Sequence, residues 1–152
     1  MTLTIDILSA GRTIVIVIFV VVILAIIAML IGKVRNFFAG RAFEGTDRVA
    51  MRSRWEEIER SASQSGEMGR KLAIIEADKL LDHALKALAM PGATLGERLK
   101  FAQYKYPELR DVWWAHKIRN QLAHEATFHL DNSMARTALK SFKKALTRLG
   151  AL

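Results

Sequence analysis

The chain of 152 residues contains no cysteine and only two prolines, Pro91 and Pro107. Without cysteine, neither thiol catalysis nor a thiolate metal site is open to it. The alternation of apolar and polar residues that marks half-buried strands is missing as well. Together these absences predict an all-α protein, and the length suits one domain plus appendages.

A long apolar run stands near the amino terminus. Residues 14–31, "IVIVIFVVVILAIIAMLI", contain no charge and no amide. A bilayer core about 30 Å thick needs roughly 20 apolar residues at 1.5 Å each, so residues 13–32 fit one crossing. The alternative is a cleaved signal peptide, but its apolar core is usually about 7–15 residues long and follows a basic segment. Only Arg12 is basic here, so segment 1–32 is predicted to be a tail and a retained transmembrane helix.

The flanks of this run differ in charge. Segment 33–54 carries six basic and two acidic side chains, whereas Arg12 is the only basic residue before the run. Lysine and arginine near a span stay on the cytoplasmic side. We therefore expect a single-pass protein of the cytoplasmic membrane, with its amino terminus outside and its carboxyl-terminal part in the cytoplasm. The basic juxtamembrane linker 33–54 would also be attracted to the lipid bilayer, by about 1 kcal/mol per residue near anionic lipid.

Residues 55–152 have the pattern of a helical domain. Apolar residues recur at helical spacing, "SASQSGEMG" and "MPGAT" break the pattern, and Thr94 with Glu97 forms a capping-box pair. The predicted helices are 55–63, 67–88, 94–102, 109–125 and 133–149. Helix 94–102 is short, and the other four, which are joined by short connections, describe an antiparallel bundle. A domain of this size buries little area alone, which makes a homodimer attractive.

One predicted helix carries an unusual polar set in "RNQLAH", residues 119–124. At about 100° per residue, His116, Asn120 and His124 form one line along helix 109–125, and Arg119 lies between that line and the apolar stripe. Arginine suits phosphate, and histidine exchanges protons near neutral pH. With an orienting amide, they suffice to cleave a phosphodiester whose own 2′-hydroxyl is the nucleophile, without a metal or cofactor.

A structural role explains the same residues equally simply. Asp78 and Asp82 stand one turn apart on helix 67–88, and either is placed to pair with Arg119 across the bundle. An Arg–Asp pair, with asparagine and histidine satisfying the remaining hydrogen bonds, would fix helix register. A metal site is not expected, because the paired Glu-x-x-His elements of helical metal proteins are missing.

"RNQLAH" resembles the motif of the HEPN superfamily: an arginine, a polar residue directly after it, and a histidine a few residues further on. Arg119, Asn120 and His124 match that motif, and the resemblance covers roughly residues 55–152. It implies a four-helix bundle and a metal-independent ribonuclease that acts as a dimer. In it Arg119 would hold the scissile phosphate, His124 would be the general acid or base, and Asn120 would shape the site. Toxin-type members often carry tyrosine where this chain has Ala126, so any role of that tyrosine does not carry over.

The last predicted helix is basic and has no acidic residue. Its cations spread over the side opposite the apolar residues, and they are Arg136, Lys140, Lys143, Lys144 and Arg148. RNA and anionic lipid headgroups are both plausible partners of such a face, and a simply solvated surface is the third option. Two functions thus remain open: a membrane-anchored ribonuclease, or a non-catalytic scaffold that recruits unknown protein partners.

Overall fold

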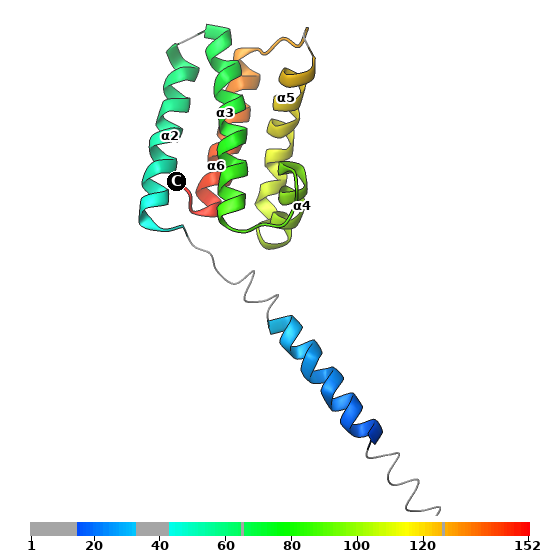
Figure 1. The fold of residues 1–152 in the computed structure, drawn as a ribbon. Coiled ribbons are helices and arrows are strands. Elements are labelled where there is room, and N and C mark those ends of the chain that lie inside the picture. Colours follow the sequence, from blue (N-terminus) through cyan, green and yellow to red (C-terminus); the bar gives the residue numbers. More distant parts are fainter. Residues whose placement is uncertain (1–14, 33–42, 65, 126) are drawn as a thin grey trace, which may run out of the picture. The chain divides into compact units, whose positions relative to one another are not determined.

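The computed structural model describes residues 15–32, 43–64, 66–125 and 127–152. Within these ranges every regular element is a helix and no strand occurs, so the all-α prediction is confirmed for this part of the chain. The chain divides into two compact units, residues 1–40 and residues 41–152, and each is considered by itself (Figure 1).

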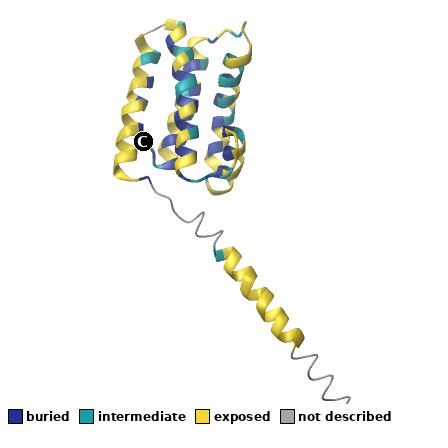
Figure 2. Cartoon of the chain, viewed as in Figure 1, coloured by how far each residue is buried: buried dark blue, intermediate teal, exposed yellow. Residues whose placement is uncertain are grey.

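The described part of the first unit is the apolar helix Val15–Gly32. It is long and apolar enough to cross a membrane, as the run of residues predicts, although a signal sequence has the same properties. Its large side chains are exposed along the whole helix (Figure 2). The predicted tail before residue 15 lies outside the described residues.

The second unit begins earlier than the sequence suggests. Helix α2 (Gly45–Gln64) includes residues 45–54 of the segment expected to be a linker at 33–54, and residues 33–42 of that segment lie outside the described residues. Met51, Trp55 and Ile58 are buried, because their spacing places them on one face of the helix. The correction has a physical reason: the arginines around Met51 cover only the exposed side of α2.

The remaining helices agree closely with the predicted ones. They are α3 (Gly66–Ala87), α4 (Leu95–Lys105), the short 3-10 helix η1 (Pro107–Asp111), α5 (Val112–His124) and α6 (Asn132–Leu149). The expected caps are present: the Thr94 side chain accepts a hydrogen bond from the Glu97 amide at 3.2 Å, and Asp131 accepts one from the Met134 amide at 2.7 Å. The segment after Pro107 starts as η1 and becomes α-helical only at Val112.

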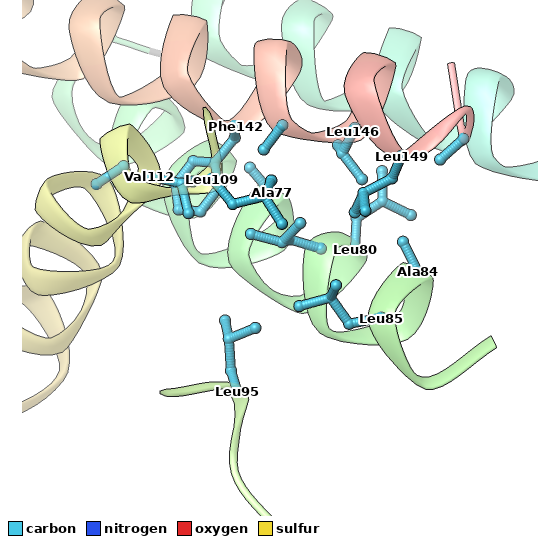
Figure 3. Close-up of a cluster of buried hydrophobic side chains, with 14 of the residues drawn as sticks. Ala77, Leu80, Ala84, Leu85, Leu95, Leu109, Val112, Phe142, Leu146 and Leu149 are labelled. Carbon is cyan, nitrogen blue, oxygen red and sulfur yellow. The ribbon is translucent and has the colours of Figure 1, made fainter. Parts of the chain in front are cut away.

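Helix α3 is the centre of this unit, and it packs against α2, α4, α5 and α6 (Figure 1). The core lies around it and contains Leu80, Leu85, Val112, Phe142 and Leu146 (Figure 3). Because α3 and α5 pack against each other, polar residues at the border of their buried faces can meet. Part of the "RNQLAH" stretch of α5, residues 119–124, lies at that border.

Candidate functional site

A cleft of about 930 Å³ opens between α2, α3, the start of α4 and α5. Among the residues that line it are Asp78, Asp82, His116, Arg119 and Asn120, all of which the sequence singles out. Three of the four α5 residues that the helical wheel places in one polar sector, His116, Arg119 and Asn120, therefore line the cleft. The fourth α5 residue of the predicted set, His124, is not part of this lining.

Four of these side chains form a closed ring between α3 and α5. His116 Nδ1 lies 2.6 Å from Asp78 Oδ1, and His116 Nε2 lies 3.3 Å from Asn120 Nδ2. Arg119 Nη1 donates to Asn120 Oδ1 at 3.1 Å, and Arg119 Nε lies 3.2 Å from Asp78 Oδ2. Each side chain of the ring thus contacts two others.

The ring fixes the proton positions on His116. A guanidinium has only donors, so the oxygen of the Asn120 amide faces Arg119 and its nitrogen faces His116. The Nε2 atom of His116 must then accept a hydrogen bond, which leaves the proton on Nδ1. That proton is donated to Asp78, so within this ring both nitrogens of His116 are engaged. His116 therefore positions its neighbours and has no nitrogen free for a substrate.

Arg119 is held by the ring but remains partly accessible. Its side chain is 30% exposed, whereas that of Asp78 is 5% exposed. The Nε atom is within ion-pair distance of Asp78 but makes no directed hydrogen bond, so this contact is an attraction between charges. No described residue accepts a hydrogen bond from Nη2. An oxyanion in the cleft would meet a guanidinium whose orientation is already set.

His124 is exposed at the carboxyl end of α5. It follows Arg119 by five positions, which in an α-helix means about 140° of rotation and about 7.5 Å along the axis. The two side chains of one chain therefore point in clearly different directions. His124 therefore does not point towards a phosphate that Arg119 of the same chain holds in the cleft.

Asp82 does not pair with Arg119, the cation considered in the sequence, but with Arg98 and Lys86. It accepts a hydrogen bond from Arg98 Nε at 2.8 Å and lies 2.7 Å from Lys86 Nζ. Burial alone would raise the pKa of Asp82, but the hydrogen bonds from Lys86 and Arg98 lower it below its ordinary value of 3.8. Of the two candidate acids, Asp78 pairs with Arg119, and Asp82 secures the start of α4.

Arg98 is a buried cation to which no sequence pattern points. Besides Asp82, it donates to the carbonyl oxygens of Gly92 and Ala93, so it ties the loop before α4 to α3. Gly92 adopts φ +138°, and a Cβ atom there would lie 2.7 Å from the Arg98 amide nitrogen. The glycine is thus required for the conformation of this loop. In the sequence, only the helix-breaking stretch "MPGAT" indicates the loop.

The basic face of α6 is largely neutralised by other elements. Lys143 pairs with Glu59 at 2.6 Å, Lys144 with Asp111 at 2.6 Å, and Arg148 with Glu108 at 2.8 Å. These acids come from α2 and η1, which is why α6 considered alone looks uniformly positive. Arg136 and Lys140 are exposed and have no ion pair with any described residue, so the positive charge of this face is concentrated at the start of α6.

Within the described ranges, no three histidine, aspartate or glutamate side chains are grouped so as to hold a metal ion. The cleft instead contains a guanidinium that is held by two oxygen acceptors, Asp78 Oδ2 and Asn120 Oδ1. The chain matches no model of a protein family, and no curated protein or solved structure is significantly similar to it.

Proposed function

We propose that this protein is a membrane-anchored, metal-independent endoribonuclease with a HEPN-like four-helix domain that acts as a homodimer in the cytoplasm. The observation that carries the proposal is Arg119, whose guanidinium is oriented by Asp78 and Asn120 yet still 30% exposed in the cleft. An oriented, accessible guanidinium is suited to hold a phosphodiester through two parallel hydrogen bonds.

The proposed reaction uses the 2′-hydroxyl of the RNA as nucleophile. A histidine takes the proton of the 2′-hydroxyl as that oxygen attacks phosphorus, the bond from phosphorus to the 5′-oxygen breaks, and the histidine returns the proton to the departing 5′-oxygen. The products are a 2′,3′-cyclic phosphate and a free 5′-hydroxyl. In this scheme Arg119 binds the phosphate and stabilises its added charge, while Asp78, His116 and Asn120 are positioning residues.

The general acid or base is His124, and the dimer brings it to the phosphate. Both nitrogens of His116 are engaged within one chain, whereas His124 is exposed. Because Arg119 and His124 of one chain diverge by about 140°, we assign the proton transfer at each phosphate to His124 of the second chain. A two-fold axis near α5 would create two such composite sites.

The test is cleavage of a single-stranded RNA by the full chain in lipid nanodiscs, with EDTA present. We expect cyclic-phosphate ends to form, and Arg119→Ala and His124→Ala each to slow cleavage by at least 100-fold. His129→Ala is the matched control, because His129 is also exposed but lies after α5. Cleavage that survives both substitutions at Arg119 and His124 would refute the proposal.

A second candidate function is favoured by the closed ring itself. Asp78, His116, Asn120 and Arg119 contact one another within a single chain, as expected for a clamp that fixes α3 against α5 in a non-catalytic scaffold. On that account Arg119→Ala lowers the stability of the domain, and RNA stays intact with every variant, including the unmodified chain.

A further inference from the structure

A groove of about 650 Å³ lies between α2 and α6, on a different part of the unit from the cleft. Among the described helices α2 packs closely only against α3, so its other side faces α6 without close backbone contact. Side chains bridge the gap: Lys143 Nζ is 2.6 Å from Glu59 and 5.9 Å from the centre of the Trp55 ring. The groove therefore remains open along the rest of these two helices.

Part of the lining of the groove is apolar. Its lining includes Trp55, Ala62, Ala135 and Leu139, and of these Trp55 and Ala135 are buried. The small side chains of Ala62 and Ala135 leave room for the side chains of another helix to enter. Trp55 is only 4% exposed, so its ring is not presented for stacking on a nucleotide base. These properties favour a protein ligand over RNA.

The rim of the groove is positively charged. Arg70, Arg136, Lys140 and Lys143 line it, against the single acid Glu59. The hydrogen bond from Lys143 lowers the pKa of Glu59 below its ordinary value of 4.5, despite the opposing effect of burial, so these two groups neutralise each other. Three cations are then left around the apolar part of the lining.

One of those cations has an unsatisfied donor. The Nε atom of Arg70 is buried and has no hydrogen-bond partner among the described residues. A buried donor without an acceptor is unfavourable, and an incoming carboxylate would supply the acceptor. This observation is independent of the charge count and points to the same kind of ligand.

We propose that the groove between α2 and α6 binds an amphipathic helix of a partner protein, with apolar side chains against Ala62 and Leu139 and acidic side chains beside Arg70, Arg136 and Lys140. This is the helix-in-groove mode of recognition, in which apolar anchors give affinity and flanking charges give selectivity. The interaction does not depend on the proposed nuclease activity, because it uses none of the residues of the ring.

The probe is a fluorescein-labelled synthetic helix with leucine and alanine on one face and glutamate on the other. Its control has lysine at every glutamate position. Binding to the full chain in nanodiscs is followed by fluorescence anisotropy. We expect the acidic helix to bind at least tenfold more tightly than the basic one.

Three variants of the protein locate the site. Arg136→Glu together with Lys140→Glu should weaken binding of the acidic helix roughly tenfold or more, and Ala62→Phe should weaken it by filling the groove without changing any charge. Lys117→Glu is the matched control, because Lys117 is exposed on α5 and does not line the groove. Circular dichroism checks that each variant keeps its helical content.

Three results would overturn the inference. The first is equal binding of the acidic and basic helices, and the second is an acidic helix that binds all variants alike. The third is a groove occupied by a second copy of the chain, seen as a change in oligomeric state on Ala62→Phe with no binding of the peptide by the unmodified protein. If single-stranded RNA displaces the acidic helix at equal concentration, the ligand is a polynucleotide and the proposed partner is wrong.

Discussion

The contact between Asp78 and His116 should contribute far more to stability than an exposed ion pair of equal length. Asp78 Oδ1 lies 2.6 Å from His116 Nδ1, with side chains that are 5% and 14% exposed. Lys144 Nζ lies 2.6 Å from Asp111 Oδ2, with side chains that are 60% and 59% exposed. The two contacts therefore differ mainly in their access to water.

The magnitudes follow from that difference. Asp78→Ala leaves a buried donor on His116 and a partly buried charge on Arg119 without a counter-ion, which should cost about 3 kcal/mol, the low end for breaking a buried pair. We expect a coupling free energy of about 2 kcal/mol between Asp78 and His116, as for buried hydrogen bonds to a charged group. The exposed pair should show less than about 0.5 kcal/mol.

The assay is a double-mutant cycle for each pair, each with both single alanine variants and the double variant. Urea unfolding of the full chain in nanodiscs, followed by tryptophan fluorescence, gives the free energy of unfolding. A coupling for Asp78 and His116 no larger than that of the exposed pair would refute the claim that the ring joins α3 to α5.

Three further predictions concern the segments around the cleft. Gly92→Ala should destabilise the domain by about 1–3 kcal/mol in thermal unfolding, because φ is +138° and the new methyl group would meet the Arg98 amide; an unchanged Tm would contradict this. Asp131→Ala should remove the cap of α6 and lower stability by about 1 kcal/mol in urea. The pKa of Asp82 is lower in the folded chain than in the unfolded one, so its stabilisation is present above about pH 4 and is lost as the pH falls through the folded pKa. The free energy of unfolding of the Asp82→Asn variant should therefore fall less than that of the unmodified chain between pH 5 and about pH 2. The free energy of unfolding of the Lys86→Gln variant should fall by an intermediate amount over the same range.

Much of the fold could be predicted from the sequence because its signals are local. The apolar spacing in α3, the cap at Asp131 and the breakers Pro91 and Gly92 each act within one or two turns. The start of α2 was missed because Met51 stands among arginines, and a charged segment after an apolar run reads as a linker. Only packing against α3 reveals its buried face.

The site could be predicted only in part. The helical wheel placed Asn120, His116 and Arg119 together because all three lie on α5. Which acid faces Arg119 depends on the rotation of α3 against α5, which sequence spacing does not define, and Asp78 was one of two equal candidates. The pairing of Lys143, Lys144 and Arg148 with acids on other elements was likewise invisible, since those acids lie far away along the chain.

The most direct test of the central claim is a mixing experiment with two inactive variants. Arg119→Ala and His124→Ala chains are combined in the same nanodiscs and assayed for RNA cleavage. A mixed dimer retains one intact composite site, with Arg119 from one chain and His124 from the other. With random pairing, we predict recovery of about one quarter of the unmodified activity. A mixture as inactive as its two components would contradict the account.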